Sequence, residues 1–270
     1  MNAILQELLA VRDAVGLCWL GNLGWLLRSG ERLVAFDLDL DRATRLRPSP
    51  IPTADLAPVL DVVFITHEHG DHFGEGTARL LAAQSDCTYV VPANCVDRAA
   101  RLGLPPSRVV VARPRQPFEI AGIPVSPQRA LHGHTSFSIY RRANLEDCGY
   151  VLTLGGRTVF QPGDTFLLQD HLEDLGPIDV LFVSPTLHNM HLVDARTLIE
   201  TLRPSFVFPQ HFGTYQPTEQ NSFWTIGYPD ELRASLDPEL RARFHTLDQG
   251  VVFRIPAPAP APPPPGPAPR

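Results

Sequence analysis

Three histidines and two carboxylates fall within six residues of this chain, directly after an apolar run. In the stretch "VVFITHEHGDHFGEG" the polar cluster consists of His67, Glu68, His69, Asp71 and His72. Crowded at the end of a strand, these groups would destabilise a fold through mutual repulsion and lost hydration. A bound cation removes that cost, because a metal takes neutral imidazoles and ionised carboxylates as ligands. The HxHxDH spacing at a strand-to-helix junction therefore predicts a metal site.

Three more polar residues end apolar runs further along the chain. They are His132 in "ALHGH", Asp164 in "FQPGD" and His211 in "FPQHF". Side chains that follow different strands can meet at one edge of a sheet, where folds of this kind build their sites. The run "LHGH" also offers His134, so the choice between the two histidines stays open. If His132 binds the metal, His134 is expected to support the ligands or to face the substrate.

Continuous and alternating apolar segments predict more strands than helices, with several helices between strands. The most economical architecture is two sheets covered by helices. An amphipathic helix is predicted over residues 1–16, and two strands over residues 17–40 around the turn Ser29–Glu31. One folded domain is expected over residues 1–255. A Pro/Ala-rich disordered tail is expected over 256–270, because its prolines cannot donate sheet hydrogen bonds.

The composition argues against several classes of partner. A formal net charge of -6 provides no basic field for nucleic acid, and the pair Arg141–Arg142 is either a solvated turn or an anion-binding element beside a site. The sequence contains no uncharged apolar run of about 18 residues, so no membrane span is predicted. Four scattered cysteines without a CxxC motif indicate free thiols and a cytoplasmic protein. The expected partner is a small-molecule substrate, and a homo-oligomer stays open.

With these residues in view, the sequence resembles the metallo-β-lactamase superfamily. The resemblance is carried by "THEHGDH", "ALHG", "PGDT" and "PQHF" in that order, and it extends from Leu17 to about Phe253. Within the superfamily, "CWLGNLGWLL" and "SPTLHNMHLVDA" are most similar to the branch that contains L-ascorbate 6-phosphate lactonase and the small metal-dependent hydrolases beside it. The resemblance implies an α/β (α+β) fold, an αββα four-layer sandwich with a metal site at one edge of the two sheets.

Carried over residue by residue, the resemblance implies a site for two divalent metal ions. The implied ligands are His67, His69 and His132 for the first ion, Asp71, His72 and His211 for the second, and Asp164 bridging both. Mixed imidazole and carboxylate ligands suit zinc or manganese first, with iron as the alternative. The chain departs from the pattern at Asn22, where many relatives have a histidine after "WLG". It also has two extra histidines, His188 and His191, which are expected either to face the substrate or to be ordinary loop residues.

The activity implied by the resemblance is hydrolysis of an ester-like bond, a lactone or a phosphoester, in a small polar metabolite. Two close cations lower the pKa of a shared water and polarise a substrate oxygen. Asp71 is expected to orient this water and His188 to protonate the leaving group. Tyr215 and Trp224 are candidates for the pocket lining, together with the arginine pair. Two alternatives remain: a di-iron oxidoreductase on the same ligands, and a non-catalytic, metal-stabilised binding protein.

Overall fold

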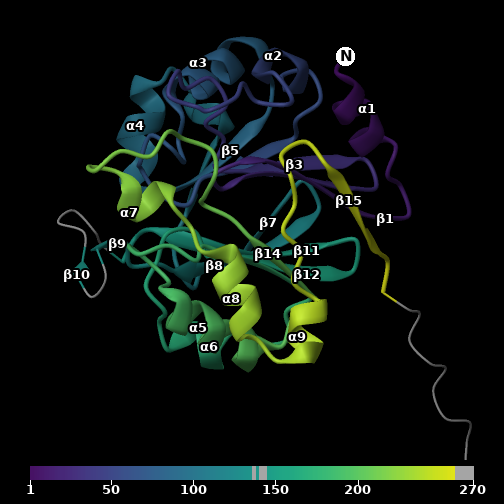
Figure 1. Cartoon of the computed structure of the whole chain (residues 1–270). Helices are drawn as coiled ribbons and strands as arrows, with labels where there is room; N and C mark the ends of the chain where they lie inside the picture. The colour runs from purple at the N-terminus through teal and green to yellow at the C-terminus, as the bar shows by residue number, and fades with distance from the viewer. Residues whose placement is uncertain (136–137, 140–144, 259–270) are drawn as a thin grey trace, which may run out of the picture.

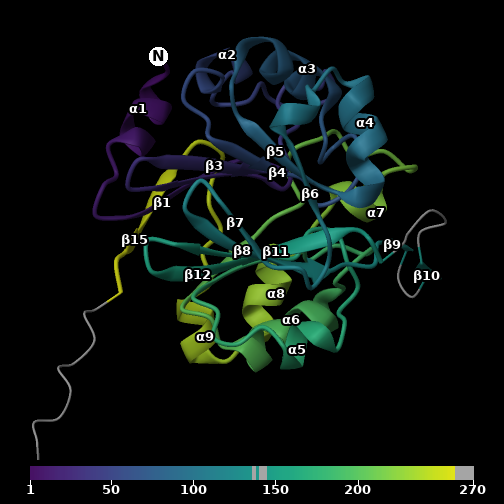
Figure 2. The ribbon, with the colours of Figure 1, turned by 180° about the vertical axis from the view of Figure 1, so that it is seen from behind.

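Two β-sheets packed face to face occupy the centre of the protein, and helices cover both outer faces (Figures 1 and 2). The computed structural model describes residues 1–135, 138–139 and 145–258. Within these residues the larger sheet contains, in spatial order, β15 (Val252–Pro256), β1 (Ala14–Gly21), β2 (Gly24–Ser29), β3 (Arg32–Phe36), β4 (Val62–Phe64), β5 (Thr88–Pro92) and β6 (Val109–Ala112). The smaller sheet contains β14 (Phe206–Pro209), β13 (Val180–Val183), β12 (Arg157–Gln161), β11 (Cys148–Leu154), β8 (Ile123–Arg129) and β7 (Phe118–Ile120). A separate short pair consists of β9 (Gly133–Thr135) and β10 (Ser138–Ile139).

The helices form two outer layers. Those over the larger sheet are α1 (Ala3–Leu9), α2 (Thr53–Leu56), α3 (Glu75–Gln84) and α4 (Val96–Arg101), with 3-10 turns at Ala93–Cys95 and Pro106–Arg108. Those over the smaller sheet are α5 (Asp170–Glu173), α6 (Leu192–Leu202), α8 (Pro229–Ser235) and α9 (Pro238–Ala242). The remaining short helix, α7 (Ser222–Thr225), lies on the same side of the molecule as β9 in both views (Figures 1 and 2). The αββα sandwich implied by the resemblance is confirmed.

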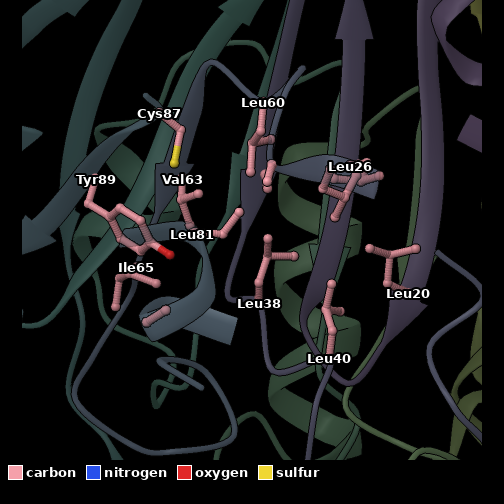
Figure 3. Packing of buried hydrophobic residues seen from close by; sticks show 14 of the residues in the cluster. Leu20, Leu26, Leu38, Leu40, Leu60, Val63, Ile65, Leu81, Cys87 and Tyr89 are labelled. Atoms are coloured by element: carbon pink, nitrogen blue, oxygen red, sulfur yellow. The ribbon is translucent and has the colours of Figure 1, made fainter. Parts of the chain in front are cut away.

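The two sheets divide the core into three apolar layers, one between the sheets and one between each sheet and its helices. Between the sheets, the ring of Trp25 lies 4.6 Å from that of Phe182 and 5.7 Å from that of Phe208, measured between centroids. These rings come from both sheets, so their burial holds the two sheets together. Between the larger sheet and its helices the layer is mostly aliphatic, and Figure 3 shows part of it, including Leu26, Val63, Leu81 and Tyr89.

Two expectations for the first forty residues are wrong in detail. The N-terminal helix stops at Leu9, because the chain from Ala14 onward joins the sheet as β1. Residues 17–40 contribute to three strands, not two, since a tight turn at Gly21–Gly24 separates β1 from β2. Both strands are almost wholly buried, so the sequence shows a continuous apolar run in which this turn is hard to see.

Parallel strands bring loops from distant parts of the sequence to one edge. β3 to β6 run parallel in the larger sheet, and β12 to β14 run parallel in the smaller one. The carboxyl ends of parallel strands lie at the same edge of a sheet, which is where ligands commonly bind in such folds. In the part of the chain that the structure describes, no helix has the length and apolar character needed to cross a membrane. Residues 259–270 of the predicted tail lie outside the described residues.

Candidate metal centre

The predicted ligands follow the carboxyl ends of strands from both sheets. They come from the loop after β4 (His67, His69, Asp71, His72), the loop after β8 (His132), the loop after β12 (Asp164) and the loop after β14 (His211). Gly163 precedes Asp164 with a φ of +68°, and a Cβ there would lie 2.7 Å from the Cβ of Thr66. Glycine therefore lets the loop after β12 approach the loop after β4 closely.

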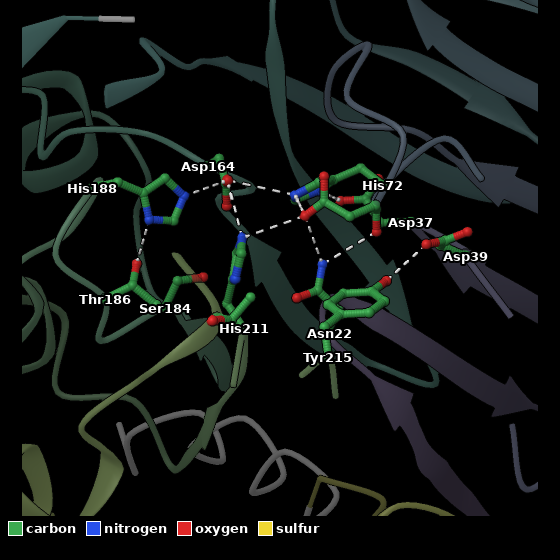
Figure 4. A network of polar contacts seen from close by, with 12 residues as sticks. Asn22, Asp37, Asp39, His72, Asp164, Ser184, Thr186, His188, His211 and Tyr215 are labelled. Atoms are coloured by element: carbon green, nitrogen blue, oxygen red, sulfur yellow. Dashed lines mark hydrogen bonds and ion pairs between the residues drawn. The ribbon is translucent and has the colours of Figure 1, made fainter. Parts of the chain in front are cut away.

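Asp164 lies at the centre of the cluster (Figure 4). Its Oδ2 is 2.9 Å from Nε2 of His188 and 3.1 Å from Nε2 of His211. The Nε2 atoms of His132 and His72 follow at 3.3 Å and 3.4 Å. All five side chains are buried. One carboxylate thus faces four imidazoles away from water.

Among the described residues, four overlapping groups of three side chains have one ligand atom each within 4.8 Å of the others. Two of them lie beside the Asp164 carboxylate: His67, His69 and His132, and Asp71, His72 and His211. The other two contain it: His67, His72 and Asp164, and His132, Asp164 and His188. The buried Nε2 atoms of His67 and His72, and Oδ1 of Asp164, make no hydrogen bond within the described residues. Buried polar atoms without partners cost free energy, and a divalent cation would satisfy them. The residues therefore fit a pair of metal ions, and their assignment as ligands stays a prediction.

Burial holds most of these side chains in the protonation states that a metal needs. Burial, followed by the proximity of His132, lowers the pKa of His69 to about 4. Burial also places the pKa of His67 well below its usual value. For Asp164 burial acts to raise the pKa, but the nearby imidazoles, that of His211 first, hold it well below the usual range. At neutral pH the cluster therefore offers neutral imidazoles at His67 and His69 and an ionised carboxylate at Asp164, whereas the carboxylates around His72 raise its pKa well above its usual value.

Two buried glutamines join the loops that carry Asp164 and His211. Gln161 Nε2 donates to Gln210 Oε1 at 2.9 Å, and Gln210 Nε2 donates to Gln161 Oε1 at 2.7 Å. The indole of Trp25, from the larger sheet, donates to the same Gln210 oxygen at 3.0 Å. Both amides are fully buried. The ends of β12 and β14 are thus tied to each other and to the opposite sheet by neutral hydrogen bonds.

Asp37 hydrogen-bonds His72 at Nδ1, the ring nitrogen that does not face Asp164, a role that the sequence analysis missed. Its Oδ2 lies 2.9 Å from His72 Nδ1, and Thr66 donates to the same carboxylate from its amide at 2.8 Å and from its hydroxyl at 2.7 Å. An ionised carboxylate only accepts, so His72 Nδ1 carries a proton and Nε2 is directed toward Asp164. This arrangement orients many metal-binding histidines. The available signal was an aspartate directly after the buried run "LVAF".

We expect Asp37→Asn to weaken metal binding by about 10- to 100-fold, as is usual when a carboxylate behind a ligand histidine is lost. The side-chain amide of the asparagine no longer fixes the proton on Nδ1 of His72. The imidazole therefore becomes less basic at Nε2 and is held less firmly in one orientation. Competition with a chromophoric chelator measures the effect. Asp61→Asn is the control, since Asp61 accepts from the Leu33 amide and from Arg32 away from the cluster. Equal metal affinity in the two variants would contradict the prediction.

Asn22, the position at which the resemblance implies a histidine, holds Asp71 in place. Its Nδ2 donates to both the backbone oxygen and Oδ2 of Asp71, each at 3.1 Å. Its backbone oxygen accepts from the amide of His211 at 3.1 Å. Asn22 has a φ of +50°, a conformation that asparagine tolerates better than most residues. Asn22 therefore links two predicted ligands, Asp71 and His211, by hydrogen bonds, whereas a histidine at this position would add a further imidazole.

A cavity of about 250 Å³ opens beside the cluster. Its lining consists of Arg42, His69, Gly70, Asp71, His132, Gly133, Asp164, His188, Phe223 and Trp224. His188 Nδ1 lies 3.0 Å from the hydroxyl of Thr186, and burial lowers the pKa of His188 to about 4. The cavity gives a small molecule access to both groups of predicted ligands and to His188.

The other candidate residues have different positions. Trp224 lines the cavity, whereas Tyr215 is buried behind it and donates to Asp39 at 2.8 Å. His191 is the N-cap residue of α6 and is not among the described residues that line the cavity. The side chain of His134 and the pair at 141–142 lie outside the described residues. Arg42 and Phe223 line the cavity although the sequence analysis did not propose them.

Comparisons with known proteins agree with this fold. Residues 34–212 match the family described as beta-lactamase superfamily domain. A "UPF0173 metal-dependent hydrolase" of Thermococcus onnurineus (strain NA1) is 30% identical over 168 residues, which are 58% of this chain and 69% of that protein. The fold is similar to that of the metallo hydrolase Igni18 from Ignicoccus hospitalis, with a TM-score of 0.70, 17% identity and coverage of 90% of this chain and 98% of that one. It is also similar to CmlA, a diiron beta-hydroxylase from Streptomyces venezuelae, with a TM-score of 0.66, 16% identity and coverage of 90% and 54%. On the family match and the Thermococcus relative, the chain belongs to the beta-lactamase superfamily, alongside the UPF0173 metal-dependent hydrolases.

Proposed function

We propose that the protein is a metal-dependent hydrolase with two divalent cations, zinc or manganese, that cleaves a lactone or phosphoester bond in a small polar metabolite. The observation that carries the proposal is the convergence of four buried imidazoles on Asp164 beside a cavity, with the buried Nε2 of His67 close by and without a hydrogen bond within the described residues. The printed name of the Thermococcus relative supports metal-dependent hydrolysis. When bound, the cations supply Lewis acidity and a water of lowered pKa.

Asp71 is proposed to hold one cation and to orient the attacking water. It lines the cavity, and Asn22 fixes its Oδ2. The remaining proposed ligands are His67, His69 and His132 for one cation, His72 and His211 for the other, and Asp164 for both. A carboxylate fixed by an outside donor keeps its direction while substrate enters, which lowers the entropy cost of aligning water and substrate.

His188 is proposed to protonate the leaving group. Asp164 is ionised and only accepts hydrogen bonds, so Nε2 of His188, at 2.9 Å, carries the hydrogen between them. The neutral ring then accepts from Thr186 at Nδ1, which fixes its orientation. The Nε2 hydrogen is thus directed at Asp164, so to act as a general acid the ring must first take up the proton that the attacking water releases and then pass it to the leaving group.

We expect His188→Gln to keep two metals per chain and to lower kcat by about 100-fold, the smaller end of the range for losing a general acid. Glutamine can donate a hydrogen bond but cannot transfer a proton. Elemental analysis and the separate values of kcat and KM are the readouts. Thr186→Val is the matched variant: it leaves the imidazole in place, frees its rotation and should cost less. If His188→Gln loses a metal, His188 is a ligand and its role as proton donor is wrong.

The test of the proposed function is reconstitution. Protein stripped with a chelator and reloaded with zinc or manganese should hydrolyse members of a panel of lactones and phosphoesters under anaerobic conditions. Two metals per chain are expected. A correctly folded, metal-loaded protein that cleaves neither class would contradict the proposal.

A di-iron oxidoreductase is the second candidate, and the fold similarity to the diiron enzyme CmlA is the observation that favours it. Two irons per chain, a coloured protein and turnover that needs oxygen would replace the hydrolase by this alternative. A metal-stabilised binding protein without turnover is less well supported, because the cluster opens on a cavity that also holds His188. The free, buried cysteines support a reducing compartment such as the cytoplasm.

A further inference from the structure

Two parts of the cavity lining contain neither a proposed metal ligand nor the proposed proton donor. One is the guanidinium of Arg42, from the loop after β3, and the other is the aromatic pair Phe223 and Trp224 of α7. A cation and an aromatic surface in one small cavity are the usual means of recognising a ligand that is both anionic and partly apolar.

Arg42 is held in a fixed position by buried neighbours. Its Nε donates to Oδ2 of Asp39 in a short ion pair. The hydroxyl of Tyr215 donates to the same oxygen at 2.8 Å, a contact drawn in Figure 4. The Arg42 Cζ also lies 5.7 Å from the centroid of the Tyr215 ring. Asp39 and Tyr215 are both buried, so the guanidinium is oriented before any ligand arrives.

The two terminal nitrogens of Arg42, Nη1 and Nη2, take no part in the contact with Asp39. Within the described residues, neither Nη1 nor Nη2 of Arg42 makes a hydrogen bond, and the side chain is 34% exposed. A Cβ at position 70 would lie 2.8 Å from Arg42 Nη2, so Gly70 leaves the guanidinium room at the cavity edge. A purely structural partner for Asp39 would need only the Nε contact. The Nη donors are matched to a planar anion such as a carboxylate or a phosphate.

The aromatic wall lies directly over the cluster. The Phe223 ring is 5.9 Å from that of His188, and the Trp224 ring is 6.1 Å from that of His211, measured between centroids. Trp224 also contacts the ring of Tyr215 at 5.7 Å, so it is braced by the residue that supports Arg42. A ligand held between these rings and Arg42 would lie against the predicted metals.

We propose that Arg42 binds an anionic group of the substrate, a carboxylate or a phosphate, while Phe223 and Trp224 receive an apolar or aromatic part of the same molecule. The substrate class is thus an ester that carries an anion away from the bond to be cleaved. This inference rests on the proposed function, since it concerns the substrate of that site. It adds a specificity-determining residue, Arg42, whose contribution is to binding and not to bond cleavage.

The test measures binding of three small probes to the metal-loaded protein by isothermal titration calorimetry. Benzoate and phenylphosphonate carry the two candidate anions, and benzamide is a neutral molecule of the shape of benzoate. At least one anion is expected to bind about tenfold more tightly than benzamide, and Arg42→Gln should abolish that difference. The anion with the larger loss distinguishes a carboxylate from a phosphate. Arg79→Gln is the control, because Arg79 is exposed on α3 and pairs with Glu75.

A second variant, Arg42→Lys, distinguishes a loss of anion binding from a loss of folding. Arg42→Lys keeps a positive charge beside Asp39 but lacks the planar fork, so it should stay folded and bind the anion several-fold more weakly than wild type. Unfolding temperature and metal content are measured for each variant. Equal binding of anion and amide by wild type, or unchanged anion binding in both Arg42 variants, would overturn the inference. Anion binding that depends on Arg42 in a protein with no hydrolysis would instead reject only the proposed function.

Discussion

Replacing Asp164 by alanine is expected to remove metal and turnover together. Its Oδ2 lies between 2.9 Å and 3.4 Å from four imidazoles, and no other described carboxylate contacts all of them. Loss of a supporting group behind a ligand commonly costs 10- to 100-fold in metal affinity or activity, so loss of the shared ligand should cost at least about 100-fold. Elemental analysis of the purified variant should find fewer than two metals per chain.

Two further variants make this result interpretable. Alanine at position 164 leaves buried imidazoles without their carboxylate, and breaking a buried charge pair costs about 3–5 kcal/mol of stability. Asp164→Asn keeps the shape and one oxygen, so it separates lost coordination from unfolding. Asp174→Ala removes an exposed carboxylate that pairs with Arg115, and it should change neither metal content nor rate. Two metals and full activity in Asp164→Asn would show that the cluster is not the site.

Metal loading is expected to raise the unfolding temperature of stripped protein by about 8–16 °C. A ligand at about 1,000 times its Kd stabilises the folded state by about 4 kcal/mol, and each kcal/mol raises Tm by about 2–4 °C in a protein of this size. Differential scanning calorimetry with zinc or manganese measures the shift. Magnesium is the control cation, because it prefers oxygen ligands and the groups here are rich in imidazole. An equal shift with magnesium would argue against an imidazole site.

The same shift should grow as the pH rises. Burial disfavours a charged His72, but the carboxylates of Asp164 and Asp71 raise its pKa well above the ordinary 6.5. The stripped protein therefore holds a stabilising proton on His72 below pH 6.5 and loses that stability as the pH rises through the raised value. Metal binding at Nε2 displaces this proton, so apparent affinity should rise about tenfold per pH unit while His72 is still protonated. Measuring the apparent metal affinity from pH 6.5 upward tests this prediction. If His72 had an ordinary pKa, the affinity would not rise further above neutral pH.

The parts of the site that could be predicted from sequence are those in which chemistry is local. Four candidate ligands fall within six residues of "HEHGDH", and the others each end an apolar run, so their position at strand ends follows from hydrophobic patterning alone. The structure brings all seven candidates into overlapping groups of three, two of which contain Asp164. The arrangement of the sheets and helices in layers could also be predicted from the sequence, because buried parallel strands appear as apolar runs that end at glycine or proline.

What could not be predicted depends on contacts between distant residues. Asp37 meets His72 across 35 positions of sequence, and no local pattern marks that pair. Arg42 looks like any surface arginine until Asp39 and Tyr215 are seen to hold it. The four-residue helix that carries Trp224 is too short to show a helical period. Tertiary geometry, not composition, decides these positions.

The glutamine pair beneath the cluster has a consequence for how the protein acquires its metal. Gln161, Gln210 and Trp25 hold the two ligand loops through neutral groups, and these hydrogen bonds depend neither on a cation nor on pH between the acid and base extremes. The predicted ligand loops are therefore held together by the fold itself. Stripped protein is expected to keep these loops in place, so a metal would bind to a site that is already formed.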